Sequence, residues 1–188
     1  DPEPTFLLIL FIESIDYWLI SSVFALILLL LLSALISGTE VAFFSLTKED
    51  ITKASGSKSN IQKLVVKLLE NPKELLATIL ISNNFINILI VLIFAYIGDT
   101  VFAQISSDVL KFGIEVILVT FLILLFGEVL PKVYATRNSL KFASFMAYPI
   151  KILNSLLAIV SIPLMNLTNV VENRLGKKQS NLSVEKLS

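Results

Sequence analysis

Oxygen-bearing side chains occur inside three long apolar segments of the sequence, where a lipid-facing helix would exclude them. They fall into three groups with nearby Gly and Pro residues: Ser33, Ser37, Gly38, Thr39 and Glu40; Ser82, Asn83, Asn84 and Asn87; Gly127, Glu128 and Pro131. An ionised side chain near the bilayer centre costs about 2.5–3.5 kcal/mol on insertion scales. Such groups normally face a cavity or a partner, so each of them is a candidate functional residue.

The three groups lie at a similar depth in the membrane when residues are counted in each segment from the same membrane edge. At about 1.5 Å of rise per residue, residues 37–40 lie roughly 10–15 Å inside the membrane edge. Residues 83–87 lie roughly 12–18 Å inside the same edge, and Glu128 lies roughly 13 Å inside it. Three separate segments are therefore predicted to place oxygen atoms in one layer.

The chemistry of this layer is uniform. Its carboxylates (Glu40 and Glu128), carboxamides and hydroxyls are all hard oxygen donors, which suit Mg²⁺ or Ca²⁺ better than softer metals. Two carboxylates would neutralise one divalent cation. Gly38 and the 127–131 segment can interrupt the helical hydrogen bonds, and the freed carbonyls can point at an ion in a cavity. The sequence predicts an intramembrane site for a hard cation.

Simpler explanations stay open for individual residues. The Ser33 hydroxyl can bond back to its own helix or pack at a helix contact, and the three asparagines can join helices without binding an ion. Glu128 and Lys132 are four residues apart, so they can form an ion pair within one helix. Glu40 can lie close enough to the membrane edge to be solvated. Glu115 is expected at the outer interface, facing outward, and has no assigned role.

The composition excludes most other classes of protein. Of 188 residues, 55% are hydrophobic and 16% are charged, whereas a soluble domain has about 25% charged residues. There is no Cys or His, so zinc, copper and haem sites lack their usual ligands. Zero formal net charge and the lack of a basic stripe give no reason to expect nucleic acid as a partner. We expect no enzyme, since an intramembrane hydrolase would need a Ser–Lys or paired-carboxylate mechanism whose geometry nothing in the sequence supports.

Three segments are long and apolar enough to cross a bilayer. Trp18–Thr39 and Leu75–Gly98 contain no charged residue, and each exceeds the ~20 apolar residues that a crossing needs. Ile114–Ala135 is apolar except for Glu115, Glu128 and Lys132. The expected fold is an all-α membrane protein with three transmembrane helices, at about residues 17–46, 75–98 and 114–136.

The distribution of lysines predicts the orientation. The connection 48–74 carries six lysines, whereas residues 1–16 carry four acidic residues and no Lys or Arg. Because positive loops stay inside, the 1–16 segment is expected outside and the connection in the cytoplasm of a plasma (inner) membrane protein. The C-terminus is also expected in the cytoplasm. Cytoplasmic juxtamembrane helices are predicted at 47–73 and 141–172, and 17–172 form the transmembrane domain.

Local signals divide these juxtamembrane regions. Thr47 and Asp50 resemble a helix capping box, the cluster 55–57 is a break, and Asn71-Pro72 begins the second span. The stretch 142–171 is apolar enough to span, but it contains two prolines and Lys151. Its amphipathic spacing favours a helix in the membrane interface, with a fourth crossing as the alternative.

Three motifs, in order and at matching spacing, carry a family resemblance. They are Ser-Gly-Thr-Glu at 37–40, Asn-Pro-Lys-Glu-Leu-Leu-Ala-Thr-Ile-Leu-Ile-Ser-Asn-Asn at 71–84 followed by Asn87, and Phe-Gly-Glu-Val-Leu-Pro-Lys at 126–132. The sequence resembles the transmembrane domain of the CorC/CNNM (cyclin M, CorB-like) family. The resemblance implies a homodimer in the bilayer that transports Mg²⁺, as efflux coupled to Na⁺ entry. A non-transporting Mg²⁺ sensor or scaffold is the alternative function.

The resemblance also implies which residues bind ions. For Mg²⁺ it implies Ser33, Ser37, Asn84, the carbonyl of Gly127, and Glu128. For a supporting role or a Na⁺ site it implies Glu40 and Asn87, with Asn83, Thr39, Pro131 and Lys132 beside them. It further implies cytoplasmic, nucleotide-binding CBS modules, to which 173–188 would be the linker, so the chain is expected to be a membrane domain without its CBS modules.

Overall fold

A computed structural model describes residues 17–157, and these residues form helices and no strand. In chain order the helices are α2 (Tyr17–Phe44), α3 (Lys48–Ser55), α4 (Asn60–Leu69), α5 (Pro72–Val101), α6 (Asp108–Leu122), η1 (Ile123–Val129) and α7 (Leu130–Arg137), followed by a helix over 139–157. The predicted all-α fold is confirmed. The predicted segment 1–16, the linker 173–188 and the remainder of the 141–172 region lie outside the described residues.

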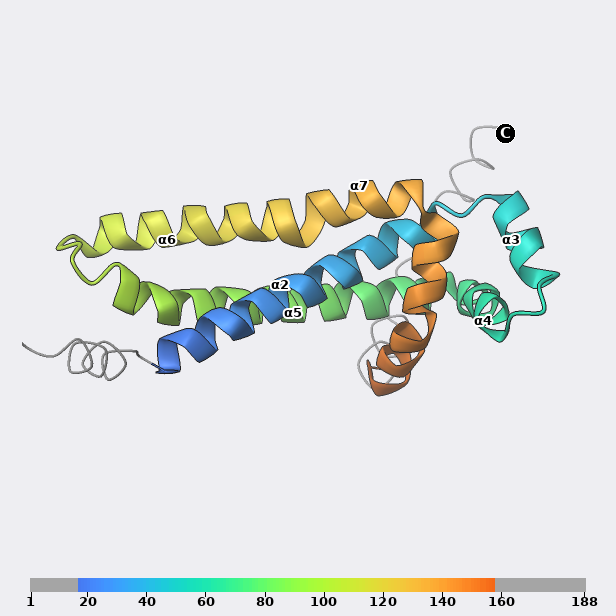
Figure 1. The fold of residues 1–188 in the computed structure, drawn as a ribbon, viewed down its shortest axis with the longest axis horizontal. Coiled ribbons are helices and arrows are strands. Elements are labelled where there is room, and N and C mark those ends of the chain that lie inside the picture. Colours follow the sequence, from blue (N-terminus) through green and yellow to red (C-terminus); the bar gives the residue numbers. More distant parts are fainter. Residues whose placement is uncertain (1–16, 158–188) are drawn as a thin grey trace, which may run out of the picture.

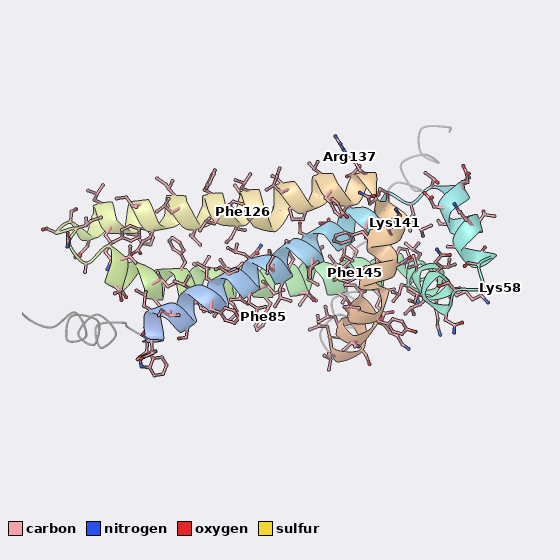
Figure 2. The ribbon with its side chains drawn as sticks, viewed as in Figure 1. Lys58, Phe85, Phe126, Arg137, Lys141 and Phe145 are labelled. Carbon is pink, nitrogen blue, oxygen red and sulfur yellow. The ribbon has the colours of Figure 1, made fainter. Side chains whose placement is uncertain are left out.

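Three of these helices are long and apolar enough to cross a membrane. They are α2, with 28 residues, α5, with 30, and the continuous rod of α6, η1 and α7 over Asp108–Arg137, also with 30. At ~1.5 Å per residue each is about 42–45 Å long, more than the ~30 Å hydrocarbon core. Large apolar side chains such as Phe85 and Phe126 are exposed on their outer surfaces, as expected for lipid-facing residues (Figure 2). The three predicted spans are confirmed.

The spans form an elongated bundle in which α2 is central (Figure 1). α2 packs against α5 on one side and against η1 and α7 on the other. Two apolar clusters hold the bundle together. One, at the end where the N-terminal part of α2 lies, contains Leu26, Ile90, Phe94, Ile97 and Val119. The other, at the opposite end, includes Ile36, Phe43, Leu75, Ile79 and Ala135. Along their helices, Ser33, Asn87 and Glu128 therefore lie between the two apolar clusters.

The short helices α3 and α4 lie beyond one end of the bundle, which we term the lysine-rich end (Figure 1). Thr47 caps α3, since its hydroxyl accepts from the Asp50 N–H at 3.2 Å while its own N–H donates to the Asp50 carboxylate at 3.0 Å. The Thr47 hydroxyl also donates to the Asp50 carboxylate at 2.7 Å, and this bond, together with the one from the Thr47 N–H, holds the pKa of Asp50 below its usual value. α3 ends at Ser55, and Pro72 occupies the first turn of α5. The predicted capping box, break and helix entry are all confirmed.

The third span contains a π-helical segment, η1, in place of a continuous α-helix. Pro131, in the first turn of α7, has no N–H to donate to the carbonyl of Gly127 four residues earlier, and its ring would crowd that carbonyl in an α-helix. The wider π turn accommodates this, and the Leu130 N–H donates to Leu125 five residues back. The predicted interruption between 127 and 131 is therefore a widening of the helix rather than a break.

The outer part of the third span differs from the prediction. α6 begins at Asp108, six residues before the predicted 114, because the Ser107 hydroxyl accepts from the Leu110 N–H at 3.4 Å and caps the helix. Glu115 was expected to face outward, and this is wrong. Its carboxylate lies against Gly98 of α5, where a missing side chain leaves room, and its Oε1 is buried.

The helix over 139–157 runs across the spans at the lysine-rich end (Figure 1). Ala143, Met146, Ala147 and Ile150 are buried and join the apolar cluster at this end. The ring of Phe142 lies against Gly38 of α2, where a Cβ would come within 2.7 Å of it. The part of the predicted 142–171 segment that is described, 142–157, thus lies in a helix oriented across the bundle.

Candidate cation site

A chain of hydrogen bonds joins one side chain from each span in the middle of the bundle. The Ser33 hydroxyl of α2 donates to Asn87 Oδ1 of α5 at 2.8 Å. Asn87 Nδ2 in turn donates to Glu128 Oε1 of η1 at 3.5 Å, a long bond that leaves the carboxylate weakly held. Ser33 is fully buried, and Asn87 and Glu128 are partly buried. The three predicted polar groups therefore do converge.

Ser33 lies at the centre of this arrangement because Asn83 faces its hydroxyl and Gly127 leaves room for it. Its hydroxyl also lies 3.4 Å from Asn83 Oδ1, so two carboxamides of α5 face it. Gly127 is buried beside it, and a Cβ built on that glycine would be 2.9 Å from the Ser33 Oγ. Only a residue without a side chain lets η1 approach α2 this closely. Ser33 bonds to α5 and not back to its own helix, so of its two simpler explanations only packing at a helix contact stays open.

Ser37 contributes a second hydroxyl one turn further along α2. It is 1% exposed, and its Oγ has no hydrogen-bond partner in the described part of the chain. A buried hydroxyl without a partner is costly, by about 1–3 kcal/mol. By contrast, Thr39 donates to the Leu35 carbonyl at 2.6 Å, so its hydroxyl is satisfied within α2. Ser37 is therefore the hydroxyl in this layer that still lacks a partner.

Asn84 is the predicted Mg²⁺ ligand that the structure does not bring to the others. Its side chain is exposed on α5, and its Nδ2 donates to the Leu80 carbonyl at 2.9 Å. It lines a hollow of about 280 Å³ that Asn87 also lines, on the flank of the bundle. Its assignment as a ligand stays a prediction. Asn87, which the sequence indicated only as a supporting residue, is the residue that links all three spans.

The second carboxylate of the layer is already paired. Glu40 Oε2 lies 3.1 Å from the Lys132 ammonium of α7, and both side chains are about one third exposed. Lys132 thus pairs between helices, not with Glu128 in its own span. Glu40 and Lys132 both line a hollow of about 390 Å³ at the lysine-rich side of the layer. The charges of Glu40 and Lys132 cancel. Glu128 therefore supplies the one net negative charge in the set Ser33, Ser37, Glu40, Asn87, Glu128 and Lys132.

The donor set is dominated by neutral oxygens. Within residues 17–157 no three side chains of the His, Cys, Asp and Glu types gather in one place. A single carboxylate with hydroxyl, carboxamide and carbonyl oxygens suits a hard cation that is held loosely enough to leave.

Comparison with known proteins places the chain in a family. The sequence profile described as the Cyclin M transmembrane N-terminal domain (CNNM) matches residues 24–187. The chain belongs to the CNNM family. The match includes α2 from residue 24 onward, the whole of the other two spans and every residue of the hydrogen-bonded chain, and the predicted family is confirmed.

Curated relatives of this CNNM domain come from bacteria and animals. It is 37% identical over 145 residues to a UPF0053 protein of Haemophilus influenzae and 31% identical over 144 residues to the UPF0053 inner membrane protein YfjD of Escherichia coli, each covering 77% of the chain. It is 31% identical over 166 residues, 82% of the chain, to the metal transporter cnnm-4 of Caenorhabditis elegans. The aligned part is 32% of each relative's length, so the chain spans about a third of these proteins. The three apolar spans and the relative named as an inner membrane protein support an integral membrane location.

The Glu40–Lys132 pair allows a charge-swap prediction. A pair that is one third exposed is worth about 1 kcal/mol, so Lys132→Glu or Glu40→Lys alone should lower the thermal unfolding midpoint in detergent by at least about 2–4 °C. The double variant restores opposite charges across the same gap and should recover most of the loss. A double variant less stable than both single variants would contradict the pairing.

Proposed function

We propose that this CNNM domain carries Mg²⁺ across the membrane through a site built around Glu128, Asn87 and Ser33. The supporting observation is that one hydrogen-bonded chain joins these side chains from all three spans. An ion that binds there would replace the long Asn87–Glu128 contact. The partnerless hydroxyl of Ser37 and the carbonyl of Gly127 would add oxygen ligands, and Mg²⁺ would keep several waters.

The transport direction we propose is efflux, driven by Na⁺ entry. The net charge of the layer supports exchange between the two ions. A site with one negative charge neutralises Na⁺ fully and Mg²⁺ by half, so neither ion is bound too tightly to be released. The protein would act as a carrier without chemical catalysis. Nucleotide would bind only to the CBS modules of the full-length protein.

We propose that the lysine-rich end is cytoplasmic, with the N-terminus outside. Among the described residues, every Lys and Arg except Lys111 lies in the segments at that end of the bundle. Lys111 pairs with Asp99 at 2.6 Å near the opposite end. This asymmetry satisfies the preference of positive residues for the cytoplasmic side.

We also propose a homodimer, with Asn84 at or near its interface. An exposed carboxamide in the middle of a span would be costly against lipid, and its neighbours Phe85 and Ile88 are exposed and apolar. A second copy of the chain would cover this face of α5. It would also supply a partner for the Asn84 Oδ1 atom.

The test is ion flux by the full-length protein in liposomes that enclose a Mg²⁺ indicator. Protein-containing liposomes should exchange Mg²⁺ against a Na⁺ gradient faster than protein-free liposomes. In parallel, Mg²⁺ should raise the thermal unfolding midpoint of the purified protein, and chelation should reverse the rise. At a hundred times the dissociation constant the stabilisation is about 2.7 kcal/mol. Stabilisation without flux would reject transport in favour of a Mg²⁺ sensor or scaffold, and the absence of both would reject the site.

A further inference from the structure

Between α4 and the 139–157 helix the structure contains a hollow lined by lysines. Two adjoining cavities, of about 340 and 260 Å³, share Leu64, Lys67 and Lys151 and so form one continuous groove. We call it the lysine groove. Its remaining lining residues are Asn60, Lys63, Leu68, Asn71, Glu74, Tyr148 and Asn154. We propose that the lysine groove binds the phosphate of an anionic phospholipid.

The charge of the groove is unbalanced. Lys63 and Lys67 are one turn apart on α4, and Lys151 faces them from the 139–157 helix. None of these three lysines forms an ion pair with a carboxylate in the portion of the chain that the structure describes. The one acidic lining residue, Glu74, accepts a hydrogen bond from Asn154 at 2.8 Å. Three lysines against one carboxylate leave the lining of the groove with a net positive charge, which attracts an anion.

A polar link holds one wall of the groove, the 139–157 helix, in place. Thr78 of α5 is fully buried, and its hydroxyl donates to Asn154 Oδ1 at 2.6 Å, while Asn154 Nδ2 donates to Glu74. The 139–157 helix is therefore tied to the first turns of α5, directly below the groove. The other wall, α4, is held by its buried Val65 and Leu68, which belong to the apolar cluster at this end. Both helices that carry the groove lysines are therefore packed in place before an anion binds.

The position of the groove selects a lipid rather than a soluble anion. α4 is seen nearly end-on beside the spans and the 139–157 helix crosses them, so both lie roughly in the membrane plane (Figure 1). Phe145, Tyr148, Ile152 and Leu156 form an exposed apolar stripe along the 139–157 helix, at the end where Lys58 and Lys141 also lie (Figure 2). Such a helix rests with its apolar stripe in the headgroup region, and Tyr148, on this stripe, also lines the groove. Acyl chains can then follow the stripe while the phosphate enters the groove.

The inference rests on the proposed orientation, which places the groove at the cytoplasmic leaflet where anionic lipids attract basic segments. It does not depend on which ion the protein carries. A failure of Mg²⁺ flux would leave it standing, and a failure of lipid binding would leave the cation site standing.

The experiment measures lipid retention by the full-length protein in nanodiscs made from equal parts of phosphatidylglycerol and phosphatidylcholine. Native mass spectrometry of the released protein should show bound phosphatidylglycerol in clear excess. Each interfacial lysine contributes about fivefold in affinity, so Lys151→Gln should reduce the excess about fivefold. The triple variant Lys63→Gln/Lys67→Gln/Lys151→Gln should remove it.

The matched control is the triple variant Lys48→Gln/Lys53→Gln/Lys58→Gln, which removes the same charge outside the groove and should keep the excess. An equal loss in both triple variants would overturn the groove as a site, since only diffuse charge would then matter. Displacement of the lipid by glycerol 1-phosphate at equal concentration would overturn the lipid as its ligand and assign a soluble phosphate instead.

Discussion

Replacing Glu128 with glutamine is expected to abolish Mg²⁺ flux and Mg²⁺-dependent thermal stabilisation while leaving the fold intact. Glutamine is nearly isosteric and keeps an oxygen that can accept from Asn87, so the packing of η1 is preserved. What is lost is the one unpaired negative charge of the layer. Two unit charges 4 Å apart interact by about 4 kcal/mol at an effective dielectric constant of 20, so a loss on the order of a thousandfold in Mg²⁺ affinity is expected.

Two further variants make this prediction specific. Glu115→Gln is the same chemical change in the same span, but its carboxylate contacts Gly98 far from the layer, so Mg²⁺ stabilisation should be unchanged. Glu128→Asp keeps the charge on a shorter side chain and should retain part of the affinity. Normal Mg²⁺ stabilisation of Glu128→Gln would contradict the site directly, and equal losses for Glu115→Gln and Glu128→Gln would assign the effect to stability alone.

Adding one methyl group at Gly127 is expected to damage the site through packing rather than through charge. A Cβ there would lie 2.9 Å from the Ser33 Oγ, so Gly127→Ala must push η1 away from α2 or break the Ser33–Asn87 bond. Overpacking of this kind costs about 1–3 kcal/mol, which corresponds to roughly 2–12 °C in the unfolding midpoint. Mg²⁺ affinity should fall at least about tenfold, since losing 1.4 kcal/mol of binding energy is already tenfold.

Gly113 provides the matched control, because it lies in the same span and a Cβ there would meet nothing within 4 Å. Gly113→Ala should be neutral or slightly stabilising, since alanine favours helices over glycine. A second test is the double variant Ser33→Ala/Gly127→Ala. Removing the Oγ leaves the new methyl at 3.5 Å from the Ser33 Cβ, an ordinary contact, so the double variant should regain the stability that Gly127→Ala loses, but not the binding. Additive stability losses would show that the clash is elsewhere.

The three spans and the layer of oxygens could be predicted because both depend on local sequence. Runs of apolar residues determine which segments cross the membrane, and residue counts determine the depth at which Ser33, Asn87 and Glu128 lie. The capping box at Thr47 was predictable for the same reason, since its partners are three residues apart.

What could not be predicted was which way each side chain turns. Asn83, Asn84 and Asn87 lie in one stretch of α5, but Asn87 faces Ser33 while Asn84 is exposed, and this depends on how α5 is rotated against α2. The sequence spacing of Glu128 and Lys132 allowed an ion pair within one helix. In the structure Lys132 pairs with Glu40 instead, because of the π turn and the position of the neighbouring α2. The Oε1 atom of Glu115 is buried for a similar reason, because a glycine on another helix leaves room for the carboxylate.

The contact between Phe142 and Gly38 has a mechanical consequence. Residue 38 directly follows Ser37, whose hydroxyl has no hydrogen-bond partner among residues 17–157, and the aromatic ring of the 139–157 helix rests there on bare backbone. The Phe142 ring directly joins the two helices at this point. A displacement of the 139–157 helix would therefore be transmitted to α2 one residue away from Ser37, within the layer of candidate cation ligands.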